Sequence, residues 1–201
     1  GTALIGVLGA VLVLLAAGVS AGARAIDAFE LAGTAAVGGI FALVMAASVL
    51  AGIAGLWFWA PKLSGITFPE GLGRLAVTLL LFGGVAAGGA QVVAVFFDAP
   101  DLALEAVDED IIEVLDVVTF VGWVVVAAGA LAMLAGIARA LSPNAPAAAD
   151  DPWDGQTLEW ATTSPPEPGN VAEPLDPVVS AAPLLDAREA EPSADDEGED
   201  A

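Results

Sequence analysis

Four long apolar runs constrain the fold of this chain more than any other feature of its sequence. They cover residues 3–23, 33–59, 75–97 and 114–140, and no charged residue interrupts them before Asp116. About 20 apolar residues suffice for a helix to cross the hydrocarbon core of a bilayer. The runs lack the alternating pattern of membrane-barrel strands. The sequence therefore predicts an all-α integral membrane protein with four transmembrane helices over these ranges.

Glycine pairs are frequent inside the apolar runs, as at residues 38–39, 83–84 and 88–89. Small residues let the backbones of neighbouring membrane helices approach closely. We therefore expect residues 1–142 to form one packed four-helix transmembrane domain rather than four separate spans.

The composition changes after Ser142. Nine prolines lie between residues 143 and 183, and they exclude a long helix there. From residue 189 onward the chain is acidic and nearly free of apolar side chains, a composition typical of disorder. The sequence thus predicts a largely extended, Pro-rich tail over residues 143–188 and a disordered acidic terminus over residues 189–201.

Histidine, cysteine and tyrosine are absent from the chain, and its formal net charge is −21. The missing imidazoles and thiolates exclude the usual ligands of haem, copper and most zinc sites. The negative charge excludes nucleic acid as a partner. Any acid–base chemistry would fall to aspartate and glutamate.

The few basic residues predict the orientation of the spans. Lys62, Arg74 and Arg139 fall on one face of the membrane, and the positive-inside rule places that face and both termini in the cytoplasm. Residues 57–59, Trp-Phe-Trp, are expected to anchor the second span at that interface. Because no basic segment precedes the first run, we expect a trimmed N-terminus rather than a signal peptide.

Two blocks of the chain carry an unusual pattern. Residues 59–65 read Trp-Ala-Pro-Lys-Leu-Ser-Gly, and residues 151–166 read Asp-Pro-Trp-Asp-Gly-Gln-Thr-Leu-Glu-Trp-Ala-Thr-Thr-Ser-Pro-Pro. In order and spacing, they resemble the C-terminal third of haem–copper oxidase subunit I, the catalytic subunit of cytochrome c oxidase. The resemblance covers helices nine to twelve and the tail of that family, and Glu70, Leu72 and Gly73 extend it.

The same resemblance implies a departure from the family's chemistry. The positions of two haem-ligating histidines of the family fall on Gly39 and Phe41, and those of two arginines that contact the haem propionates fall on Asp101 and Leu102. None of these residues supports the family's role. We therefore expect no catalytic, cofactor-binding or metal residue in this chain, although haem and copper belong to the family it resembles.

A set of structural or docking positions remains, all within the two blocks: Pro61, Lys62, Trp153, Glu159 and Trp160. The acidic stretch 98–113 could bind a hard cation or dock a basic redox protein. A solvated acidic loop is the simpler explanation.

The sequence favours a degenerate subunit I-like protein that acts as a non-catalytic structural or accessory component of a respiratory oxidase. Its expected partners are the lipid bilayer and other oxidase subunits, in the plasma membrane of a prokaryote. Two alternatives stay open. The chain is a fragment of a catalytic subunit that takes part in electron transport and oxygen reduction only within an assembled complex, or it is an unrelated membrane scaffold with an acidic partner-binding tail.

Overall fold

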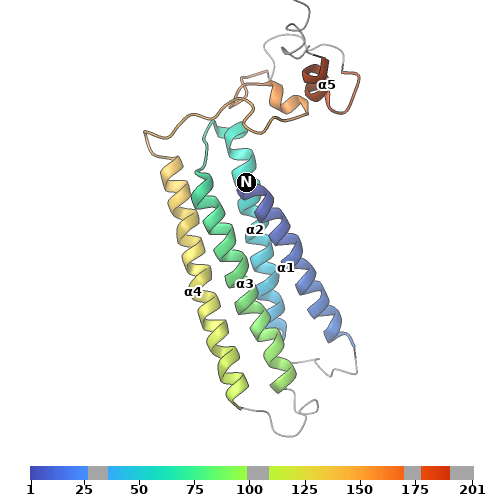
Figure 1. The fold of residues 1–201 in the computed structure, drawn as a ribbon, viewed down its shortest axis with the longest axis vertical. Coiled ribbons are helices and arrows are strands. Elements are labelled where there is room, and N and C mark those ends of the chain that lie inside the picture. Colours follow the sequence, from blue (N-terminus) through green and yellow to red (C-terminus); the bar gives the residue numbers. More distant parts are fainter. Residues whose placement is uncertain (27–35, 99–108, 170–177, 191–201) are drawn as a thin grey trace, which may run out of the picture. The chain divides into compact units, whose positions relative to one another are not determined.

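The computed structural model describes residues 1–26, 36–98, 109–169 and 178–190 (Figure 1). Its elements are helices α1 (Thr2–Arg24), α2 (Ala36–Ser64), α3 (Glu70–Asp98), α4 (Glu109–Ala140) and α5 (Pro183–Ala190), with a 3₁₀ turn, η2 (Leu158–Ala161). Strand pairing among the described residues is limited to one isolated antiparallel bridge, between Ile66 and Ala147. The all-α prediction is confirmed.

Within the described residues, four helical stretches are long and apolar enough to cross a membrane: Thr2–Arg24, Ala36–Ser64, Glu70–Val95 and Asp110–Ala140. They match the four predicted spans in number and order. The helices extend past the apolar runs, most clearly in α2, which continues beyond Trp59 to Ser64. Apolarity marks only the part of a helix suited to hydrocarbon, whereas backbone hydrogen bonding and capping decide where the helix ends.

The chain forms two compact units. The first, called the helical unit, comprises residues 1–58 and 68–139; the second, the tail unit, comprises residues 59–67 and 140–201. Residues 59–67, which the sequence assigns to the membrane domain, thus group with the tail.

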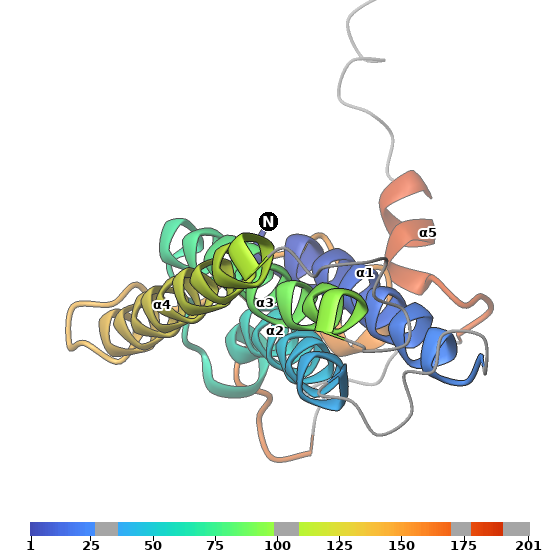
Figure 2. The same ribbon diagram turned by 90° about the horizontal axis from the view of Figure 1, so that it is seen from below.

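In the helical unit, α3 contacts each of the other three long helices, whose arrangement is seen end-on in Figure 2. Its contact with α4 depends on glycine. A Cβ atom added at Gly122 would lie 2.5 Å from the backbone nitrogen of Ala87 and 2.9 Å from the carbonyl oxygen of Gly83. Backbones this close leave no space for a side chain, which is the small-residue packing that the glycine pairs predict.

Trp57 lies inside the helical unit, with 2% of its surface exposed. Its ring packs against Phe68, with 4.7 Å between ring centroids, and it faces Gly136 of α4. The expectation that Trp57 anchors α2 at the membrane interface is therefore wrong. The size of the indole makes it equally suited to filling a core, and apolarity alone does not separate the two roles.

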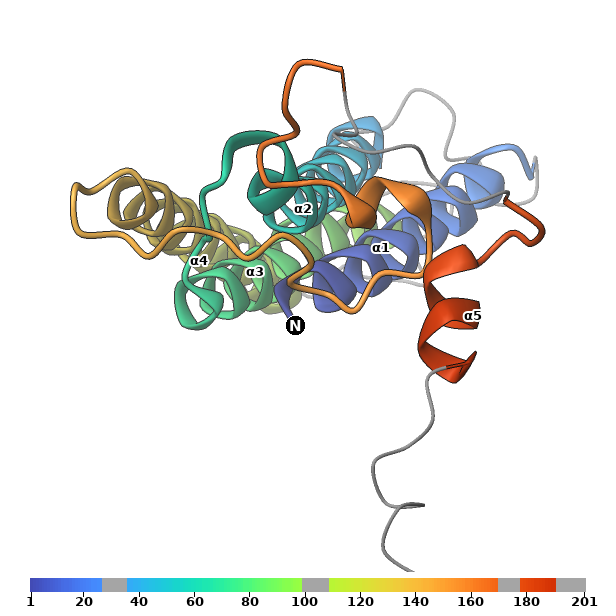
Figure 3. The ribbon, with the colours of Figure 1, turned by 90° about the horizontal axis from the view of Figure 1, so that it is seen from above.

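The tail unit contains more regular structure than its prolines suggest. The turn η2 and helix α5 contact each other, as seen from above in Figure 3. The Leu184 N–H donates to the Gln156 carbonyl at 3.1 Å. Helix α5 begins at Pro183, where proline is tolerated because first-turn N–H groups have no intrahelical partner. Its last two residues fall within the range expected to be disordered, whereas residues 191–201 lie outside the described residues.

Candidate functional site

The end of α2 shapes the centre of the tail unit. Helix α2 stops at Ser64 because Gly65 adopts a left-handed conformation, with φ of 67°, and donates its N–H to the Pro61 carbonyl at 2.9 Å. This is the common glycine-terminated helix end. A Cβ at Gly65 would approach Pro165 Cδ and the Ser164 carbonyl oxygen, each at 3.1 Å. Gly65 therefore both ends the helix and lets the Ser-Pro-Pro segment lie against it.

Lys62 is the most unusual residue of this region, because only 2% of its surface is exposed. Its Nζ donates to the Asp150 carbonyl at 3.2 Å and to the Thr162 carbonyl. A buried ammonium is costly unless it is hydrogen-bonded, and here backbone oxygens meet that need. The two carbonyls come from either side of η2, so one side chain holds both ends of the intervening segment.

Trp160 completes this cluster. It is 5% exposed, and its ring stacks on that of Trp59, with 5.8 Å between centroids and 16° between planes. The Lys62 ammonium lies 5.7 Å from the Trp160 centroid, within the range of a cation–π contact. We call Trp59, Lys62, Asp150, Trp160 and Thr162 the tail anchor.

Backbone pairing and capping bonds close the unit around the tail anchor. The Ala148 N–H donates to the Gly65 carbonyl at 3.0 Å, and the Ser164 N–H donates to the Asp150 carboxylate at 2.8 Å. The Gly155 N–H donates to both carboxylate oxygens of Asp151, at 2.8 and 2.9 Å. Such side-chain-to-backbone bonds fix irregular segments that lack a helical or strand ladder.

Arg188 links α5 to the same turn. Its guanidinium donates to the Asp154 carbonyl at 3.2 Å and also to the Gly155 carbonyl. Arg188 is the one basic residue of the tail in the printed sequence, and its charge is directed at backbone oxygens. Sequence reasoning missed this role, although a lone arginine in an acidic, Pro-rich tail was a usable signal.

Glu159 is exposed on η2, and its pKa lies below the ordinary value of a glutamate. The main cause is a hydrogen bond with the Thr157 side chain, followed by a bond with its own backbone, and the positive charge of Lys62 adds to both. Each of these favours the ionised form. The carboxylate thus contributes a negative charge near the tail anchor.

The structure brings together part of the predicted set. Lys62 and Trp160 are in contact, Glu159 acts on Lys62 through its charge, and Pro61 is fully buried in the last turn of α2. Trp153 lies half-buried in the turn held by Asp151, to which its N–H donates at 3.4 Å. Trp59 was expected to be an anchor at the membrane interface rather than a partner of Trp160. The carbonyls of Asp150 and Thr162 were not singled out from the sequence, because backbone oxygens leave no residue signature.

Gly39 and Phe41, which the resemblance places at haem-ligand positions, lie on α2 in the helical unit. A Cβ at Gly39 would lie 2.7 Å from the Gly88 carbonyl oxygen and 2.8 Å from the Val92 nitrogen on α3. No side chain fits there without separating the two helices. Phe41 is 63% exposed and offers no ligand atom. These residues do not fit a haem, whereas Asp101 and Leu102 lie outside the described residues.

Among the described residues, no group of three or more histidine, cysteine, aspartate or glutamate side chains could hold a metal ion. Asp110 and Glu113 of the predicted acidic stretch 98–113 are exposed on α4. The remainder of the acidic stretch lies largely outside the described residues.

Comparison with known proteins gives a distant similarity. No protein-family model matches the chain. The chain is similar to cytochrome c oxidase subunit 1 of Alkalihalophilus pseudofirmus, with 25% identity over 131 residues, or 65% of this chain. The chain spans about a fifth of the length of that curated relative, since the match covers 21% of it.

The four helices are long and apolar enough for a membrane protein, and the similarity supports a distant relationship to an oxidase subunit. More particularly, the chain resembles cytochrome c oxidase subunit 1.

Proposed function

We propose that this chain is a non-catalytic structural or accessory component of an aerobic respiratory oxidase complex, corresponding to the C-terminal third of subunit I. The carrying observation is that a chain similar to cytochrome c oxidase subunit 1 contains no histidine. Imidazole is the ligand through which the family it resembles holds haem and copper. A chain without imidazole has the helices and the tail motifs but lacks the ligands for haem and copper.

The packing around Gly39 supports the same proposal. The position expected to carry a haem ligand is filled by direct backbone contact between α2 and α3. In the tail unit, by contrast, residues of both blocks of the resemblance meet in the tail anchor, where Lys62 lies over the Trp160 ring. A protein that keeps its tail anchor and closes its haem position is suited to assembly rather than to oxygen reduction.

The test is gentle detergent purification of the tagged chain from its native membranes, followed by mass spectrometry of the proteins that accompany it. We expect stoichiometric oxidase subunits, including a second, histidine-bearing catalytic subunit. Recovery of the chain without any oxidase subunit would refute the proposal and favour an unrelated scaffold.

A second function is favoured by the short coverage of the relative, about a fifth of its length. Here the chain is one piece of a catalytic subunit and contributes to electron transport only in the assembled complex. The same purification distinguishes the two proposed functions. Under this alternative, the remaining helices of subunit I should be recovered as other polypeptides, and no second, complete catalytic subunit should be present.

We further propose that the chain resides in a bacterial plasma membrane with Lys62, Arg74 and Arg139 on the cytoplasmic side. The chain has no cysteine, so single-cysteine variants report topology without background. An impermeant thiol reagent should label Ala25→Cys in intact cells and Ser142→Cys only after permeabilisation. The reverse pattern would invert the orientation.

A further inference from the structure

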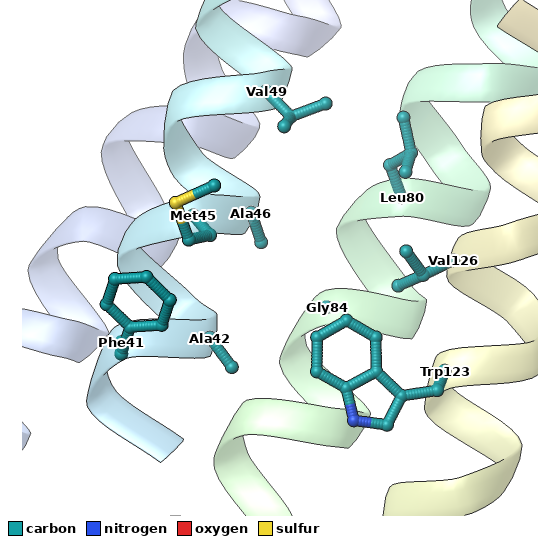
Figure 4. A pocket seen from close by; sticks show the side chains of 9 residues that line it. All are labelled: Phe41, Ala42, Met45, Ala46, Val49, Leu80, Gly84, Trp123 and Val126. Carbon is teal, nitrogen blue, oxygen red and sulfur yellow. The ribbon is translucent and has the colours of Figure 1, made fainter. Parts of the chain in front are cut away.

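The helical unit contains an apolar pocket of about 320 Å³ between α2 on one side and α3 and α4 on the other (Figure 4). Phe41 and Trp123 lie across from each other at one end, and Val49 and Leu80 lie at the other. Between them the pocket is bordered by small or apolar side chains: Ala42, Met45, Ala46, Gly84 and Val126.

The chemistry of this pocket restricts what can occupy it. No charged side chain lines it. The pocket is open to its surroundings, since Phe41 and Trp123 are 63% and 46% exposed, and its apolar lining offers a water molecule few polar partners. The lining residues also belong to helices long and apolar enough to cross a membrane, so the surrounding medium is hydrocarbon. The group that occupies the pocket is therefore a hydrocarbon.

The shape of the pocket restricts the occupant further. On α2 the lining runs from Phe41 to Val49, about 12 Å at 1.5 Å per residue, parallel to the helix axis. One leaflet contributes about 15 Å of the roughly 30 Å hydrocarbon core, and its chains run along the same direction. A slot with this length and orientation matches one lipid chain.

A transmembrane helix does not fit the slot equally well. Even the whole empty space of about 720 Å³, spread along this length, gives a mean width of about 9 Å, below the 10–12 Å diameter of a helix with its side chains. A helix could cover the opening but could not enter.

We propose that this slot binds one acyl chain of a membrane phospholipid, held between the rings of Phe41 and Trp123. Recognition is of the chain and not of the headgroup, because no charged residue lines the slot. The proposal requires only that the helical unit lie in a bilayer, so it stands independently of the proposed respiratory role.

The test uses the full chain in lipid-free detergent, titrated with phosphatidylcholine that is brominated in its acyl chain. Bromine quenches nearby indoles, and Trp123 forms one wall of the slot. We expect saturable quenching with about one lipid per chain, and we expect Trp123→Phe to remove the saturable part. Native mass spectrometry should show one retained phospholipid.

A matched pair of variants separates the slot from the general lipid-facing surface. Val49 lines the slot and Val44 does not, although both are valines of α2 with similar exposure, 38% and 37%. Val49→Phe narrows the slot and should weaken lipid binding at least tenfold, whereas Val44→Phe should leave it unchanged. Circular dichroism checks that both variants fold. If Val49→Phe does not fold, Trp123→Ala takes its place, and native mass spectrometry measures how much lipid that variant retains.

Two results would overturn the proposal. Equal lipid retention in Val49→Phe and Val44→Phe would place the lipid elsewhere on the surface. If the unmodified chain formed a dimer without bound lipid, and Val49→Phe made that dimer dissociate, the slot would be the binding site for a second copy of the chain.

Discussion

The helical unit and the tail unit are held together in different ways. In the helical unit, contacts such as Gly39 against Gly88 depend on the absence of side chains, and any atom added there meets backbone. In the tail unit, the buried ammonium of Lys62 reaches two backbone carbonyls around η2. Close backbone contacts at glycines thus distinguish the first unit, and hydrogen bonds from individual polar side chains to the backbone distinguish the second.

The difference also separates the two parts of the resemblance. The residues that resemble the tail motifs of subunit I meet in one unit, whereas Gly39, one of the two positions expected for haem ligands, is packed against α3. The proposed structural role accounts for both observations, because it needs the tail motifs and does not need a haem ligand. Four predictions break or sharpen this comparison.

The largest effect is expected for Gly39→Val. Its side chain would collide with the backbone of α3, and overpacking of this kind costs about 3 kcal/mol of unfolding free energy. Gly52→Val is the matched control on the same helix, because a Cβ at Gly52 meets nothing within 4 Å. The unfolding free energies of both variants are measured by titration with a denaturing detergent, with circular dichroism as the signal. Equal stability of the two variants would show that the contact at Gly39 is not tight.

Next in size is Lys62→Met, which removes the charged donor of the tail anchor. Hydrogen bonds to charged groups contribute about 2 kcal/mol, so cleavage by chymotrypsin after Trp160 should become about 30-fold faster. Arg74→Met removes an exposed base of the helical unit and should leave this rate unchanged. An unchanged rate in Lys62→Met would contradict the anchoring role.

A smaller effect is expected for Arg188→Gln, because this side chain is exposed. Loss of its bonds to the Asp154 and Gly155 carbonyls should cost about 1 kcal/mol and loosen α5 from the turn. Hydrogen exchange at the Leu184 amide, which donates to Gln156, should become about fivefold faster. Glu189→Gln, on the same helix, supplies the control and should exchange like the unmodified chain.

The smallest effect concerns pH. The folded pKa of Glu159 is lowered, so its contribution to tail stability is present above the unfolded pKa of about 4.3 and is lost as pH falls through the folded value. The rate of cleavage after Trp160, measured with a protease that is active in acid, should therefore increase as the pH falls. The Glu159→Gln variant should show a smaller increase. Thr157→Val, which removes the main cause of the shift, should move the transition to higher pH.

The helical unit was the more predictable of the two from sequence. An apolar segment of more than 20 residues in hydrocarbon must satisfy its backbone N–H and C=O groups by hydrogen bonds within the segment. A helix does this whatever its neighbours are. The ends were less predictable, because α2 continues through Pro61 and stops only where Gly65 turns the chain. The burial of Trp57 depends on which helices pack together, and no local pattern encodes that choice.

The candidate site was predictable in part. Lys62 and Trp160 were identified through motifs, but their meeting across about 100 residues depends on tertiary folding. Backbone carbonyls such as that of Asp150 cannot be singled out from side-chain identity. The short helix α5 was missed because the prolines before it dominate the local pattern, although Pro183 itself starts the helix.

The claim that the helical unit holds no haem can be tested most directly by restoring the imidazoles. Phe41→His alone, and Gly39→His combined with Phe41→His, are titrated with haem in detergent and followed by visible absorption. The unmodified chain, which contains no histidine, is the baseline. We predict that Gly39→His adds no saturable, one-to-one haem binding to that of Phe41→His alone, because the backbone of α3 occupies the space beside Gly39. A one-to-one haem complex that forms only when Gly39→His is present would contradict the account.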